Sequence, residues 1–136
     1  MRILVVDAQG GGVGRQLVLK IREKLPDAVI MAVGTNTVAS SAMLKAGADS
    51  AATGENAVVV GCRKADVIVG PVGIAITDAM DGEITSVMAE AVARSDARRI
   101  LIPFYHCDTY IAGVTNRSMG ALIADAVREL TDPSTD

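Results

Sequence analysis

An α/β fold with a doubly wound, mainly parallel sheet is predicted by three features of this sequence. Short runs of β-branched and aliphatic residues alternate with segments of helical periodicity. The composition is 50% hydrophobic but only 2% aromatic, so the core is built from Ala, Val, Ile and Leu, which suits a sheet covered by closely packed helices. The first apolar run leads directly into a glycine cluster that opens a helix, as in nucleotide-binding α/β domains.

Five or six short segments rich in β-branched residues are expected to form strands. They are Ile3–Val6, Val29–Val33, Asp49–Ala52, Val67–Val69, Ile100–Ile102 and Tyr110–Val114. Helical periodicity lies between them, for example over residues 84–92 and 119–130. The segment Ala57–Cys62 is ambiguous because its three valines favour a strand. We assign it to a helix, since a parallel connection between the flanking strands requires one.

The last strand is expected to run antiparallel. Only residues 104–108 separate Ile100–Pro103 from the apolar run at Tyr110. A parallel connection requires a dozen residues or more, so we predict a hairpin whose turn lies at the carboxyl edge of the sheet. Residues 1–130 are expected to form a single domain, followed by a disordered tail over residues 131–136.

The turn after the first strand carries the clearest functional pattern. Gly10, Gly11, Gly12 and Gly14 fall within five positions, although a tight turn needs only one or two glycines. Glycines let a phosphate approach the backbone, and the free N–H groups of a helix start attract anions. We therefore predict that residues 10–14, Val13 included, bind the phosphate of a nucleotide. The spacing departs from Gly-x-Gly-x-x-Gly, because Arg15 stands where the third glycine belongs.

Two further turns follow predicted strands and supply candidate ligand contacts. Thr35 and Asn36 stand where a dinucleotide-binding domain places an acid for the ribose hydroxyls, and no Asp or Glu occurs there. These two residues suit a ribose or an additional phosphate, which favours NADP over NAD; alternatively, they turn the chain and cap the next helix. Gly70, Pro71 and Gly73 are candidates for contact with the middle of the ligand, with a plain turn as the alternative.

The aromatic residues of the chain and its one histidine gather between residues 104 and 110. His106 and Cys107 are the candidates for proton transfer or nucleophilic catalysis, and packing of a hairpin against the sheet edge explains them as well. The Tyr-x-x-x-Lys pair of short-chain dehydrogenases is absent after Tyr105 and Tyr110.

Acidic residues near the predicted site have structural explanations. Asp7 closes the first strand and is expected to anchor the glycine turn through backbone N–H groups. Asp78, Asp81 and Glu83 precede a predicted helix, whose positive N-terminal end accounts for them. Their spacing matches no magnesium or calcium motif, so no metal site is predicted.

Charge and hydropathy narrow the functional classes. The net charge of −3 and the scattered Lys and Arg residues argue against nucleic-acid binding. No apolar run reaches membrane-spanning length, and the first strand leaves no room for a signal peptide, so a cytoplasmic protein without a membrane partner is expected. The small, apolar chain is expected to form a homo-oligomer.

As a set, several short motifs resemble a family of short bacterial Rossmann-like proteins known only as a domain of unknown function. The motifs are Asp7–Gly14, Gly34–Asn36, Ala52–Asn56, Gly70–Ile74, Gly82–Thr85 and Ile100–Pro103. The resemblance implies a Rossmann-like fold and an intracellular bacterial protein, and it implies no activity.

Three functions remain open from the sequence. The first is a small nucleotide-binding protein, with NADP or NAD as the best candidate ligand and a sensor or accessory role. The second is a small cofactor-dependent oxidoreductase or transferase. The third is a ligand-free homo-oligomeric assembly module.

Overall fold

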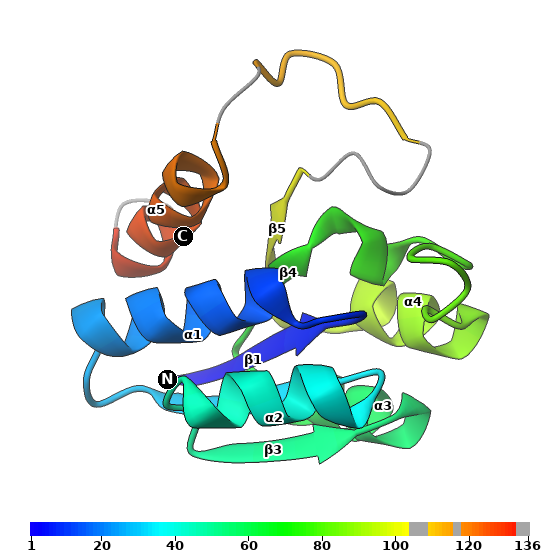
Figure 1. Cartoon of the computed structure of the whole chain (residues 1–136), viewed down its shortest axis with the longest axis horizontal. Helices are drawn as coiled ribbons and strands as arrows, with labels where there is room; N and C mark the ends of the chain where they lie inside the picture. The colour runs from blue at the N-terminus through cyan, green and yellow to red at the C-terminus, as the bar shows by residue number, and fades with distance from the viewer. Residues whose placement is uncertain (104–108, 116–117, 133–136) are drawn as a thin grey trace.

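Five parallel strands form the centre of the molecule in the computed structural model, which describes residues 1–103, 109–115 and 118–132 (Figure 1). The order across the sheet is β3-β2-β1-β4-β5, and every pairing is parallel. This is the strand order of the Rossmann fold. The strands are β1 (Arg2–Asp7), β2 (Val29–Gly34), β3 (Ser50–Thr53), β4 (Val67–Pro71) and β5 (Arg98–Ile102).

Helices cover both faces of the sheet. The ambiguous segment at residues 57–62 lies within a helix, as predicted. Among the described residues, no helix is both long and apolar enough to cross a membrane. The helices are α1 (Gly12–Lys24), α2 (Thr37–Lys45), α3 (Glu55–Lys64), the 3-10 turn η1 (Val72–Ala75), α4 (Ser86–Arg94) and α5 (Met119–Thr131).

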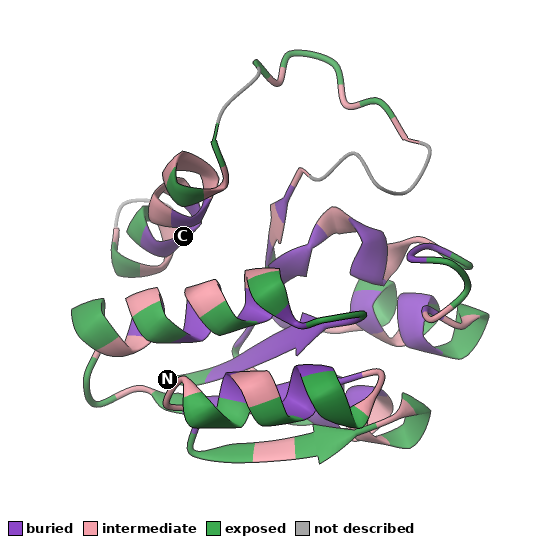
Figure 2. Ribbon diagram, in the orientation of Figure 1, coloured by how far each residue is buried: buried purple, intermediate pink, exposed green. Residues whose placement is uncertain are grey.

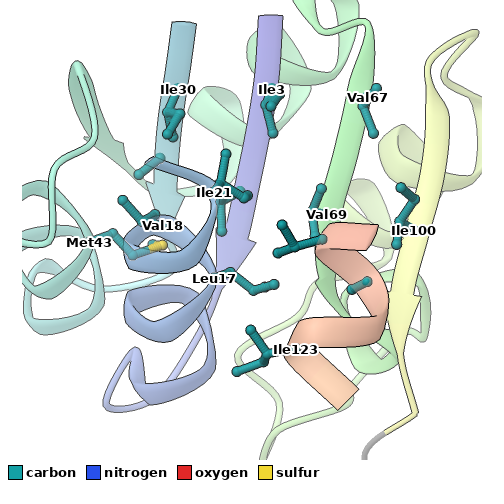
Figure 3. Packing of buried hydrophobic residues seen from close by; sticks show 14 of the residues in the cluster. Ile3, Leu17, Val18, Ile21, Ile30, Met43, Val67, Val69, Ile100 and Ile123 are labelled. Atoms are coloured by element: carbon teal, nitrogen blue, oxygen red, sulfur yellow. The ribbon is translucent and has the colours of Figure 1, made fainter. Parts of the chain in front are cut away.

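Alternating side chains of the strands divide the core into two layers. Ile3 and Val5 of β1 face α1, α2 and α5, whereas Leu4 and Val6 face α3 and α4. Figure 3 shows the first layer, in which side chains of α1 and α5 pack over β1, β2, β4 and β5. The buried colouring of β1 and β4 in Figure 2 agrees with their central positions in the sheet.

The predicted antiparallel strand at Tyr110–Val114 is wrong. Residues 109–115 are irregular, and Gly113 has a left-handed backbone (φ +86°) in a turn that pairs Val114 N–H with Ile111 O. A left-handed residue interrupts the extended conformation that a ladder needs. The chain instead continues to α5, which contacts α1 and β5. Helix α5 reaches Thr131, and the domain boundary expected at residue 130 stays a prediction.

The sheet changes its winding direction between β1 and β4. From β1 the chain moves outward through β2 to β3, and then returns to the other side of β1 with β4 and β5. The carboxyl ends of β1 and β4 therefore lie side by side, with their following connections on opposite faces. Ligands of open α/β sheets bind at this position.

Candidate functional site

A cavity of about 250 Å³ lies at the carboxyl ends of β1 and β4. One wall is the turn after β1, and the other comes from the end of β4 and the connection that follows it. The cavity therefore brings together six of the predicted site residues, from both glycine turns. Its lining is Asp7, Ala8, Gln9, Gly10, Gly11, Gly12, Val13, Pro71, Gly73 and Met80.

Two glycines of the first turn are required by packing. Gly11 has a left-handed backbone (φ +72°), and a Cβ there would lie 2.7 Å from the Cα atom of Ala39 in α2. A Cβ on Gly14 would lie 2.5 Å from the Met43 sulfur and 2.9 Å from the Cβ of Asp7. These glycines therefore allow α1 to approach α2 and β1 closely, and they explain half of the cluster without a ligand.

The other two glycines have open space around them. A Cβ on Gly10 or Gly12 would meet no atom within 4 Å, and neither residue has the left-handed backbone that favours glycine. Within the part of the chain that the structure describes, no hydrogen bond uses either backbone N–H group. Neither turn geometry nor packing accounts for these two residues, and both line the cavity.

Asp7 anchors the glycine turn, as predicted. Its side chain is only 4% exposed, and its two oxygens accept the N–H groups of Ala8 (2.8 Å) and Gly14 (2.7 Å). Burial raises the pKa of Asp7 above its usual range, while the hydrogen bonds from Gly14 and Ala8 oppose this shift. The carboxylate thus accepts N–H groups at the start of α1 and leaves the N–H groups of Gly10 and Gly12 available.

The second glycine turn has one structural glycine and one beside the cavity. A Cβ on Gly70 would lie 2.5 Å from the carbonyl oxygen of Val6, so this residue is required by the close approach of β4 to β1. Gly73 and Pro71 line the cavity, and a Cβ on Gly73 would lie 2.8 Å from the terminal methyl of Met80. Gly14 and Gly70 do not line the cavity themselves.

Thr35 and Asn36 lie outside the cavity lining and bind a carboxylate of the protein itself. The Oε1 atom of Glu83 accepts the Thr35 hydroxyl (2.6 Å) and the Asn36 side-chain amide (2.9 Å). The backbone N–H of Gln9 donates to the same oxygen (3.0 Å). Asn36 also caps α2 by accepting the N–H of Ala39 (2.9 Å), which was the structural alternative for this turn.

The acidic turn before α4 has a different role from the one expected. Helix α4 starts at Ser86 behind the cap Thr85, and its first turn contains no acid. Asp81 instead accepts the side-chain amide of Gln9 (3.1 Å), next to the contact of Glu83 with the Gln9 backbone. Gln9 therefore joins the connection between β4 and α4 to the glycine turn.

Sequence reasoning missed Gln9, Met80, Asp81 and Glu83 at this site. The one available signal was the acidic character of residues 78–83, which their position before a helix explained equally well.

His106 and Cys107 lie outside the described residues. Burial raises the pKa of Cys62 to about 11, so this thiol is poorly suited to nucleophilic chemistry. No group of three or more potential metal ligands occurs among residues 1–103, 109–115 and 118–132.

One protein-family model matches almost the whole chain. The model of the domain of unknown function DUF3842 matches residues 2–135. The chain belongs to this family. A search of the curated proteins finds no match.

Two solved structures are similar to the DUF3842 chain at low sequence identity. One is a dodecameric FMN-dependent Ubix-like decarboxylase from Escherichia coli O157:H7, with 15% identity over 96% of this chain and 75% of that chain, at a TM-score of 0.45. The other is AibC, with 19% identity over 96% of this chain and a TM-score of 0.51. This chain spans 41% of AibC. The likeness to AibC shows a shared α/β fold.

Proposed function

We propose that this protein binds a nucleotide whose phosphate lies against the turn at Gly10 and Gly12. The observation that carries the proposal is this pair of glycines. Packing explains Gly11 and Gly14, but Gly10 and Gly12 have open space, line the cavity and have N–H groups without a partner among the described residues. Backbone N–H groups at the start of a helix, beside the switch point of the sheet, bind phosphate in this fold.

The charge of the site favours a bridging phosphate. Asp7 lies beneath the turn, and Asp81 and Glu83 contact Gln9 at its edge. These carboxylates repel a terminal phosphate, which carries close to two negative charges, more strongly than a diphosphate bridge, which carries one charge per phosphorus. NAD and NADP contain such a bridge. They remain the best candidates for the ligand, with AMP expected to bind more weakly.

We propose a sensor or accessory role for the complex. Among the described lining residues, Asp7 is the one ionisable group, and two backbone N–H groups already hold its carboxylate. The phosphate would therefore be held without a free general acid or base in the described lining of the cavity. The alternative, an oxidoreductase or transferase, depends on His106 or Cys107.

The test compares Gly12→Val with Gly120→Val. Both glycines lie in the first turn of a helix, and a Cβ on either would meet no atom within 4 Å, so both variants are expected to fold. Thermal shift and calorimetry with NAD, NADP, FMN, FAD, ATP, GTP and coenzyme A first identify a ligand of the wild type. A ligand at a hundred times its dissociation constant adds about 2.7 kcal/mol, which raises the melting temperature by several degrees.

The valine at position 12 is expected to abolish this shift, because its methyl groups fill the space in which the phosphate would lie. The valine at position 120 is expected to leave it unchanged. Equal binding by the two variants would remove the glycine turn as the phosphate site. If the protein binds none of the seven compounds, the ligand-free assembly module is favoured instead.

We also propose that the protein forms a homodimer through the outer face of α1 and α2. Leu19 and Val38 are 46% and 64% exposed, and both line a groove between these helices. Light scattering is expected to give twice the monomer mass of 14.0 kDa for the wild type. Val38→Lys is expected to give the monomer, whereas Val87→Lys, at an exposed valine on α4, is expected to stay dimeric. A monomeric wild type contradicts the proposal.

A further inference from the structure

A carboxylate lies at the carboxyl end of β2, although the turn that follows β2 contains no acidic residue. In dinucleotide-binding sheets, an acid at this position binds the ribose hydroxyls, and an arginine nearby accommodates a ribose 2′-phosphate. The turn after β2 contains neither, but the structure brings Glu83 to it from the connection between β4 and α4. Oε1 of Glu83 accepts donors from both Thr35 and Asn36 at this turn.

These contacts use one oxygen of the carboxylate and leave the other available. Oε1 accepts three donors, from Gln9, Thr35 and Asn36, at 2.6–3.0 Å. No hydrogen bond among the described residues uses Oε2. The three donors also lower the pKa of Glu83, although partial burial opposes the shift, so the group is ionised at neutral pH. An oriented carboxylate with one free oxygen is suited to accept a hydroxyl donor.

The segment that holds Glu83 is firmly attached to the core. Ile84 is fully buried and Ala79 is 5% exposed, and the turn closes on itself through Asp78 N–H donating to Ile84 O (2.7 Å). Asp78, Met80 and Asp81 have left-handed backbones (φ 58–66°), a conformation that non-glycine residues retain only where the surroundings fix it. Glu83 therefore stays at the end of β2 without a ligand to hold it there.

Positive charge is missing from two of the three segments that meet at this carboxylate, whereas the third, which carries Gln9, continues into α1 with the exposed Arg15. Residues 25–44, which include β2 and its following turn, contain no Lys or Arg, and neither do residues 65–93, which include β4 and the acidic turn. Asp81 adds a second carboxylate beside Gln9. A phosphate group on the ribose would thus approach two carboxylates without a cation from either segment to balance its charge.

We infer that Glu83 determines the nucleotide specificity of this site, by accepting a free ribose hydroxyl and excluding a ribose 2′-phosphate. The inference rests on the proposed nucleotide-binding function. It replaces the preference for NADP that the missing acid after β2 suggested with a preference for NAD. The structure places the carboxylate of Glu83 beside Thr35, although the two residues are 48 positions apart in the sequence.

The experiment measures the affinities of NAD and NADP, which differ only in the 2′-phosphate, for the full chain and for Glu83→Gln. Glutamine keeps an oxygen for the three donors and removes the charge. The wild type is expected to bind NAD about tenfold or more tightly than NADP, as the repulsion of close like charges in a partly exposed site would give. In Glu83→Gln this ratio is expected to approach one, mainly through tighter binding of NADP. Glu90→Gln, on the outer face of α4, is the control and is expected to keep the ratio of the wild type.

Ionic strength provides a second measurement. Raising the salt concentration is expected to reduce the NAD:NADP ratio of the wild type, because screening weakens the repulsion, and to leave the ratio of Glu83→Gln unchanged. Equal affinities of the wild type for the two nucleotides would overturn the inference and leave the proposed function standing. An equal loss of affinity for both nucleotides in Glu83→Gln would also overturn it, since that result means a structural role. If the wild type binds neither NAD nor NADP but binds another of the seven compounds, the inference fails and the proposed function stands; if it binds none of the seven, both fail.

Discussion

The turns after β1 and β2 each lie against a carboxylate, but the two carboxylates reach their positions differently. Asp7 is the last residue of β1, is 4% exposed, and accepts N–H groups from within seven residues of itself. Glu83 is half-buried, comes from another connection, and accepts donors from three residues at least 47 positions away. The first contact fixes the local shape of one turn. The second attaches the connection between β4 and α4 to both turns, which are also joined directly by the side-chain amide of Asn36 donating to Gln9 O (2.9 Å).

This difference separates a structural acid from one that is available to a ligand. Both oxygens of Asp7 are engaged inside the protein, so its charge acts on a ligand only through space. Glu83 has an oxygen without a described partner and sits beside solvent. We therefore expect substitution of Asp7 mainly to lower the free energy of unfolding, and substitution of Glu83 mainly to change the ligand preference.

Asp7→Ala is expected to have the larger effect on stability. It leaves the N–H groups of Ala8 and Gly14 without their acceptor in a buried place, for an expected loss of about 2–3 kcal/mol of unfolding free energy. Glu83→Ala removes contacts at a half-buried position, where solvent replaces part of the interaction, for a loss of about 1 kcal/mol or less. Urea unfolding of each variant, with the exposed Asp27→Ala as control, measures the contrast. Equal losses at positions 7 and 83 would show that the comparison is wrong.

Local patterns in the sequence predicted most of the fold. The continuous apolar run of β1 and the periodicity of α1 identify these elements correctly, because β1 is buried on both faces of the sheet and α1 packs one side against it. The structural role of Asp7 was also predictable, because the strand end and the helix start that it joins are adjacent in the chain. The last strand failed because Ile111 and Val114 have high β-propensity, while the left-handed Gly113 between them and the packing of α5 decide the outcome.

The candidate site was predictable only where its parts are local. The glycine cluster was found, but sequence alone did not show that Gly11 and Gly14 serve packing against α2, whereas Gly10 and Gly12 face open space. The contact of Glu83 with Thr35 depends on how the β4–α4 connection folds over the sheet edge, and no periodicity or spacing encodes it. The absence of an acid after β2 in the sequence therefore did not reveal the carboxylate that the structure brings to this turn.

The pH dependence of stability gives the smallest effect and tests the two carboxylates with opposite signs. Burial raises the pKa of Asp7 above its unfolded value of about 3.8, so the folded state takes up its proton at a higher pH than the unfolded state. Its contribution makes the unfolding free energy fall as the pH rises from about 3.8 through that raised pKa. The hydrogen bonds to Glu83 lower its pKa, although partial burial opposes them. Its stabilisation is therefore present above its unfolded value of about 4.5 and is lost as the pH falls through its lowered pKa.

Because the two contributions oppose each other, the variants are more informative than the wild type. Removing the titration of Asp7 with Asp7→Asn is expected to make stability rise more steeply with pH between about 3 and 6, since the carboxylates with lowered pKa values then act without opposition. Glu83→Gln is expected to make that rise shallower. The negative charge of Glu83 is also a minor cause of the raised pKa of Asp7, so the neutral glutamine is expected to reduce the contribution of Asp7 slightly as well. Urea denaturation at a series of pH values measures each slope. A shallower slope in Asp7→Asn would mean that hydrogen bonding outweighs burial at that residue, and that both carboxylates behave alike.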